Sequence, residues 1–259
     1  MKKLILLFVS ICFLTSCNVT ESIIFDKDMS GHYMTAFDMA PMLDYANANR
    51  PPSKESPIQE KIDTTVVFND LYKTHKDSIT ALTDDQRLEF DKLKDMVLKV
   101  QMDEEKGIFK FEMSKKFKAF DELKTIYEET DEAMDYVKEM SNKEGKAPKQ
   151  QLDELTQTAK VSFSFENNTF SRFQPELKLD DDMEEVEEDD EDDMFKKQFE
   201  ELFSNSFYTL TYKFPKKLKS VSSTNAVISE DGKTVVYKVS WNAINSDASV
   251  MNLDVVLED

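Results

Sequence analysis

Glycine and histidine are scarce in this chain of 259 residues, which has 4 Gly, 2 His, 2 Cys and 1 Trp. So few glycines leave little room for the Gly-rich loops that cradle phosphate groups. His32 and His75 have no second His or Cys at the spacing of metal ligands, and no local catalytic motif surrounds them. We therefore expect no metal, no cofactor and no enzymatic activity. A hydrolase whose triad or carboxylate pair forms only in space is the alternative that stays open.

Basic charge is also in short supply, since 33 Lys and Arg residues face 52 Asp and Glu residues and the formal net charge is −19. Nucleic-acid binding requires clustered cations, so this balance argues against it. From Asp180 to Asp193 every residue is Asp or Glu except Met183 and Val186. We interpret this run as a solvated acidic loop (180–193). It could bind Ca²⁺ weakly, although it lacks the Gly-centred ligand spacing of an EF-hand.

Long hydrophobic runs are missing as well. The apolar stretch from Leu4 to Leu14 is too short for a transmembrane helix, which needs about 20 residues. It follows two lysines and ends in Leu14-Thr15-Ser16-Cys17, an order typical of a secretory signal. The run Leu14-Thr15-Ser16-Cys17 resembles a bacterial lipoprotein lipobox. That resemblance implies cleavage before Cys17, a diacylglyceryl thioether on its sulfur and usually a third acyl chain on the new amino terminus.

A lipidated Cys17 would hold the protein firmly on a membrane, because each buried methylene contributes about 0.8 kcal/mol and two or more chains give stable anchoring. The expected organisation is a signal peptide over residues 1–16 and a single domain over 17–259. Cys12 would leave with the signal, so we expect no disulfide in the mature protein.

Alternating apolar residues predict several hairpins in that domain. They are expected over 20–37, 98–113, 161–173 and 208–241, with a last strand at Leu253, Val255 and Leu257. The stretch from Asp63 to Phe68 could be strand or helix. A Pro-rich loop is expected near residues 46–57, and a helix after the capping-box sequence Thr83-Asp84-Asp85-Gln86.

A longer helix is predicted by an apolar stripe at three-and-four spacing, ending near Ser141. Its members are Phe120, Leu123, Tyr127, Met134 and Val137. The stripe could bind a partner, but we expect it to cover the sheet. Each predicted strand is apolar on one side only, so we predict an α+β fold, a mainly antiparallel sheet with helices packed on one face.

Several segments together resemble uncharacterised envelope lipoproteins of the Bacteroidetes, especially flavobacteria. They are 17–25, Ser30-Gly31, 63–65, 76–79, 102–105, 117–123, 214–217 and 229–235. The last two are also loosely similar to the β-rich domain of mycobacterial lipoproteins implicated in lipid binding. The resemblance implies O-linked glycan acceptors at Thr64 and Ser78. It also implies a periplasm-facing place on the outer membrane, because Asn18-Val19-Thr20 precede Glu21 where surface-exported relatives carry an acidic signal.

These observations predict a membrane-anchored lipoprotein with a non-catalytic binding or interaction domain. Its ligand would be a lipid or another envelope component. The alternatives are a structural or assembly partner of other envelope proteins, and a cryptic hydrolase.

Overall fold

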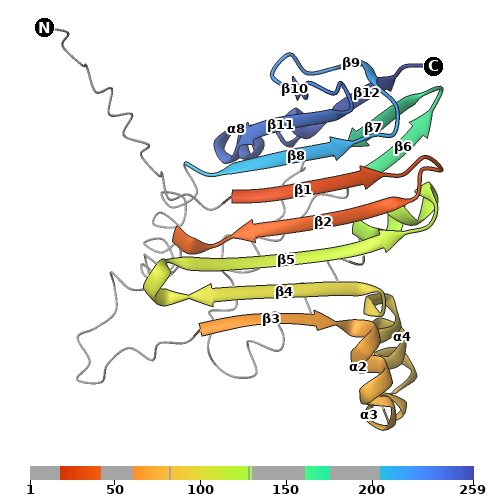
Figure 1. Cartoon of the computed structure of the whole chain (residues 1–259), viewed down its shortest axis with the longest axis vertical. Coiled ribbons are helices and arrows are strands. Elements are labelled where there is room, and N and C mark those ends of the chain that lie inside the picture. Colours follow the sequence, from red (N-terminus) through yellow and green to blue (C-terminus); the bar gives the residue numbers. More distant parts are fainter. Residues whose placement is uncertain (1–17, 42–60, 82, 128, 130–160, 176–204) are drawn as a thin grey trace, which may run out of the picture.

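Two β-sheets make up the domain in the computed structural model, which describes residues 18–41, 61–81, 83–127, 129, 161–175 and 205–259. The larger sheet has eight strands in the order β10-β11-β8-β1-β2-β5-β4-β3, and the smaller has four in the order β6-β7-β12-β9. In Figure 1 the large sheet runs from β10 and β11 at the top to β3 at the bottom, and the small sheet lies at the upper right.

The strands of the large sheet are β1 (Asn18–Phe25), β2 (Gly31–Asp38), β3 (Lys61–Val67), β4 (Met96–Asp103), β5 (Ile108–Phe117), β8 (Phe207–Lys213), β10 (Val227–Ile228) and β11 (Thr234–Ser240). Those of the small sheet are β6 (Ser162–Glu166), β7 (Thr169–Phe173), β9 (Leu218–Val221) and β12 (Leu253–Leu257). The helices with described bounds are α2 (Phe68–Thr74), α3 (Lys76–Thr80), α4 (Asp84–Leu93), α8 (Trp241–Ser246), η1 (Glu104–Lys106) and η2 (Ala248–Met251). A further helix covers residues 120–127.

The first strand, β1, lies in the middle of the large sheet. It pairs antiparallel with β2 and parallel with β8, so that Ile23 stands between Tyr33 and Tyr212. All other pairs among the described strands are antiparallel. The segment that directly follows Cys17 is therefore hydrogen-bonded on both sides.

The main core fills the space between the two sheets. Inward-facing residues of the large sheet, such as Ile23 and Leu210, pack with Phe170 and Val255 of the small sheet, and each of these four is fully buried. Aromatic rings dominate the contact, and the ring centroids of Phe25 and Phe170 lie 5.4 Å apart. Such edge-on aromatic contacts add to the stabilisation that burial provides.

Turn residues set the hairpins where the sequence predicted them. Asn167 and Asn168 connect β6 and β7 with φ of 51° and 59°, a left-handed backbone that asparagine tolerates better than most residues. Gly31 opens β2 where the chains approach closely, because a Cβ there would lie 2.1 Å from the Ile24 carbonyl oxygen. No other residue fits at that position without displacing β1.

The predicted α+β class is wrong. The four-stranded sheet and the helix over 120–127 cover the large sheet, whereas α2, α3 and α4 lie beyond the ends of β3 and β4 (Figure 1). The physical reason is that one-sided alternation fixes which face of a strand is buried but not what buries it. Here the covering layer is itself made of strands. The predicted last strand, β12, and the Val161–Phe173 hairpin, β6 and β7, pair with each other in the small sheet.

Most of the other predicted elements are confirmed, and some lie outside the described residues. The hairpins over 20–37, 98–113 and 161–173 are confirmed as β1–β2, β4–β5 and β6–β7. The 208–241 hairpin is confirmed as paired β8 and β11, although Trp241 begins α8 instead of continuing the strand. The open stretch 63–68 is strand up to Val67. The Pro-rich loop, the acidic loop and the helix beyond residue 129 lie outside the described residues.

Candidate functional site

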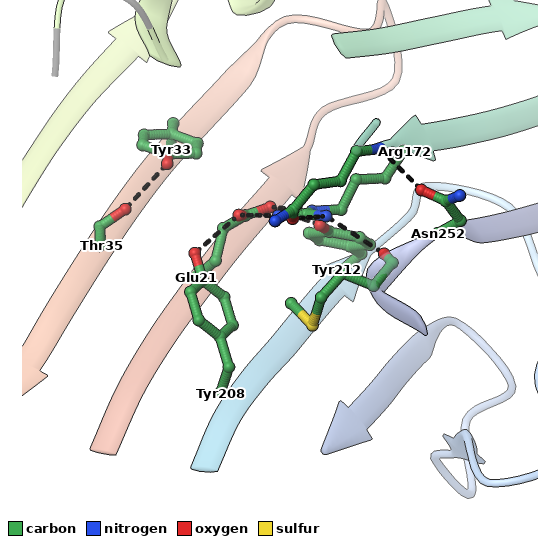
Figure 2. Close-up of polar contacts among 9 residues, drawn as sticks. Glu21, Tyr33, Thr35, Arg172, Tyr208, Tyr212 and Asn252 are labelled. Atoms are coloured by element: carbon green, nitrogen blue, oxygen red, sulfur yellow. Dashed lines mark hydrogen bonds and ion pairs between the residues drawn. The ribbon is translucent and has the colours of Figure 1, made fainter. Parts of the chain in front are cut away.

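A charged cluster lies inside the core, formed by Glu21 of β1, Arg172 of β7, and Tyr208 and Tyr212 of β8 (Figure 2). We call it the buried charge cluster. Both charged side chains are 0% exposed. Because β7 belongs to the small sheet and the other strands to the large one, this cluster joins the two sheets through polar contacts.

Every acceptor position of the Glu21 carboxylate is used. Oε1 accepts from Arg172 Nε at 3.3 Å and from the Tyr212 hydroxyl, while Oε2 accepts from Arg172 Nη2 at 3.3 Å and from the Tyr208 hydroxyl at 3.0 Å. Arg172 Nη1 donates to Gln174 Oε1 at 2.9 Å and to the Met251 carbonyl at 3.1 Å. A buried ion pair of this kind is tolerated only when its remaining polar groups are satisfied, and here they are.

Burial shifts the pKa values of several side chains in and around this cluster. It raises the pKa of the Tyr33, Tyr208 and Tyr212 hydroxyls well above their usual value, and the negative charge of Glu21 raises each further. Burial lowers the pKa of Arg172, but the neighbouring Glu21 carboxylate outweighs this and holds that pKa well above its usual value. Arg172 therefore stays charged and the three tyrosines stay neutral over the ordinary pH range.

We expect the free energy of unfolding to fall as the pH rises above about 10, where unfolded tyrosines ionise. The folded state keeps those protons while the unfolded state loses them, so alkaline pH favours unfolding. Urea midpoints at pH 8 and at pH 10.5 measure this decrease. A Tyr208→Phe/Tyr212→Phe variant should lose less stability between the two pH values than the parent. An equal loss in both proteins would contradict the assignment.

The cluster offers no surface to a ligand, so we assign it a structural role. Its sequence signal was nevertheless present, because Glu21 occupies an inward position of the alternation Val19, Glu21, Ile23 and Phe25. Arg172 similarly follows Phe170 on the buried phase of β7. A charged residue on the apolar phase of a strand indicates a buried partner, and neither residue was interpreted in that way from the sequence.

The residues predicted as modification sites lie apart from one another. Cys17 is outside the described residues, but Asn18, directly after it, begins β1. Thr64 is exposed in β3 at the edge of the large sheet, and Ser78 belongs to α3. Lipidation and glycosylation stay predictions.

The two histidines are not part of a described cluster. His32 lies on the outer face of β2, where burial and the nearby Lys116 lower its pKa and Glu112 opposes them. His75 is exposed between α2 and α3. Within the described ranges, no three His, Cys, Asp or Glu side chains gather as a metal site would require.

A hollow opens on the outer face of the large sheet, the face turned away from the small sheet, with a volume of about 230 Å³. We call it the outer-face pocket. Strand register explains it, since Ala36 lies between Thr20 and Glu112 in one cross-strand row and its small side chain leaves a gap. The polar residues around the gap are Asn18, Thr20, Asp38, Lys99, Gln101, Lys110 and Glu112.

Comparison with known proteins does not identify a family for this chain. No family model and no curated protein matches the chain. Among solved structures, the NMR structure of the folded domain of the Mycobacterium tuberculosis LppM protein matches with a TM-score of 0.35 and 10% identity, covering 93% of this chain and 91% of that one. At these values the likeness establishes neither a shared fold nor a shared activity. The resemblance to flavobacterial lipoproteins stays a prediction. Among the described helices, none is both long and apolar enough to cross a bilayer.

Proposed function

We propose that this chain is a non-catalytic binding domain held by a lipidated Cys17 on the periplasmic side of a bacterial outer membrane, and that it binds the acyl chains of a lipid. The observation that supports this is an apolar surface on the inner face of β2, β4 and β5. We call it the apolar strip. Its residues are Phe37, Leu98, Val100, Met102, Phe109 and Phe111.

The apolar strip continues the inner face beyond the main core. None of its residues belongs to the buried cluster between the two sheets, and each is only half-buried. The rings of Phe37 and Phe111 lie 6.0 Å apart across β2 and β5. A second small core of Leu93, Met96 and Met113 adjoins one end of the strip, leaving the rest of it less buried.

A run of half-buried apolar side chains this long is a natural binding surface for a hydrocarbon chain, because burying apolar area is worth roughly 25 cal/mol per Å². The predicted lipidation of Cys17 would place this surface near a membrane, which supports the same ligand. The strip lies beside Val19, two residues from the predicted acylated cysteine, since Phe37 pairs directly with Val19.

Replacing Val100 with Glu places a charge in the middle of the apolar strip. We expect the amount of co-purified lipid to fall about tenfold or more, because desolvating a carboxylate there opposes acyl-chain binding. Native mass spectrometry of the Cys17→Ser protein, with and without Val100→Glu, measures bound lipid directly. Val227→Glu, the same change at an exposed position of β10 on the opposite edge of the large sheet, is the matched control and should retain lipid. A parent protein that never carries lipid would disprove the proposal.

An assembly partner is the second candidate, and the open edge of the large sheet favours it. Among the strands that the structure describes, β3 pairs only with β4, and six of its seven residues are exposed. An exposed edge can accept a strand from another protein. Crosslinking from Asp63 in intact cells would separate the two functions, since a stoichiometric protein adduct at β3 supports assembly and its absence supports lipid binding.

A further inference from the structure

The outer-face pocket combines charges of both signs in a regular pattern. Cross-strand register places Asp38 beside Lys110 in one row, and Glu112 beside Lys99 in the next. Each cation therefore has a carboxylate as neighbour along the row. The amides of Asn18 and Gln101 flank the Asp38–Lys110 pair, and Asp63 of β3 follows Gln101 in the same row. Such a lining can hold a ligand that carries one anionic and one cationic group.

These charges are available to a ligand. Lys110 Nζ lies 3.6 Å from Asp38 Oδ2, and the two side chains are 55% and 37% exposed, so their pair contributes little and is easily exchanged. No ion pair joins Lys99 to Glu112 in the part of the chain that the structure describes, although they face each other across β4 and β5. Gln101 Nε2 donates to Asp63 Oδ1 at the long distance of 3.4 Å, which makes this a weak hydrogen bond.

The position of the pocket limits the classes of ligand that it would meet. Four strand ends meet there, since β1 and β5 begin and β2 and β4 end at the same side of the sheet (Figure 1). Asn18 lines the pocket and is covalently joined to Cys17. If Cys17 carries lipid, as the proposed function requires, the pocket is held at the depth of the lipid headgroups.

The size of the pocket and the net charge of the chain limit the class of ligand further. A volume of about 230 Å³ lies below the range of roughly 300 to 1,000 Å³ typical of sites for drug-sized ligands, and suits a single headgroup. The formal net charge of −19 repels a purely anionic headgroup. A zwitterion avoids this repulsion and matches both signs of the lining.

We propose that the outer-face pocket binds the phosphoethanolamine headgroup of a membrane lipid, its phosphate on Lys99 and Lys110 and its ammonium on Asp38 and Glu112. The ammonium donates three hydrogen bonds to carboxylates and carbonyls, whereas the methylated ammonium of choline donates none and is bulkier. The pocket should therefore distinguish the two headgroups.

The test uses the full chain with Cys17→Ser, titrated with glycerophosphoethanolamine, glycerophosphocholine or inorganic phosphate and followed by amide shifts in NMR. We expect glycerophosphoethanolamine to shift the amides around the pocket and to bind at least about fivefold more tightly than the other two probes. Lys99→Gln/Lys110→Gln should weaken it about tenfold, through loss of two charge-assisted hydrogen bonds. Ala36→Leu, which fills the gap without changing charge, should weaken it similarly.

Lys216→Gln/Lys217→Gln, which removes the same charge outside the pocket, is the control and should leave the affinity unchanged. Absence of binding, or binding that the pocket variants do not weaken, would overturn the inference. Equal binding of inorganic phosphate or glycerophosphocholine would overturn the role of the two carboxylates. Phe37 and Phe111 of the apolar strip also line the pocket, but strand alternation puts their side chains on the face opposite to Ala36, Asp38, Lys110 and Glu112. Lipid retained in native mass spectra alongside such a result would therefore leave the proposed function intact.

Discussion

Replacing Arg172 with Met should lower the free energy of unfolding by about 3–5 kcal/mol, because it leaves the Glu21 carboxylate buried without its cation. The change also removes donors from the Met251 carbonyl and from Gln174. A domain of this size is stabilised by about 5–15 kcal/mol in total, so the loss is a large share. Urea unfolding followed by circular dichroism measures it.

Two further variants distinguish a broken ion pair from a general packing defect. Glu21→Leu/Arg172→Met removes both charges and should be more stable than either single variant, because replacing a buried pair with apolar groups is often neutral or favourable. Lys124→Met, which breaks the exposed pair with Asp121, should leave the urea midpoint nearly unchanged. If the double variant is as unstable as the sum of the singles, the charge pair is not what joins the sheets.

Replacing Cys17 with Ser should move the protein from the membrane to the soluble fraction almost completely. A serine hydroxyl cannot form the predicted thioether, and without two or three acyl chains nothing comparable anchors the domain. Alkaline carbonate extraction followed by immunoblotting measures the partition, and the intact mass reports the missing acyl chains.

Cys12→Ser is the control, since the sequence predicts that Cys12 leaves with the signal peptide. This variant should stay in the membrane fraction like the parent. If the Cys17→Ser protein stayed membrane-bound through carbonate extraction, the anchor would have to lie elsewhere, and the headgroup pocket would lose the argument from its position beside Cys17.

Anchor and core are closely connected in this domain. Asn18 begins β1, which pairs with β2 and β8 on its two sides, and Glu21 links the same strand to the small sheet. The strand that would carry the lipid is therefore among the most firmly held in the structure. If Cys17 is lipidated, a surface built on the neighbours of β1 would keep a fixed distance from the membrane, as the proposed recognition of lipids requires.

The hairpins could be predicted because their signals are local. Alternation with period two marked β1, β2, β4 and β5, and the Asn167-Asn168 pair marked the turn of β6 and β7. The candidate surfaces could not be predicted in the same way. The outer-face pocket depends on Ala36 standing beside Glu112 across two strands, a neighbourhood that only the register creates.

The sequence by itself determined which residues of each strand face inward, where most turns fall and which cysteine is the anchor candidate, since each follows from a short stretch of chain. Only the tertiary structure decided that β12 joins β7 in a second sheet, that β8 runs parallel to β1, and that Glu21 meets Arg172 across 151 positions. The alternation along a strand specifies which of its faces is buried, but it does not specify which other segment of the chain covers that face. The choice between helix and sheet as the covering layer is made by packing and hydrogen bonding between distant segments.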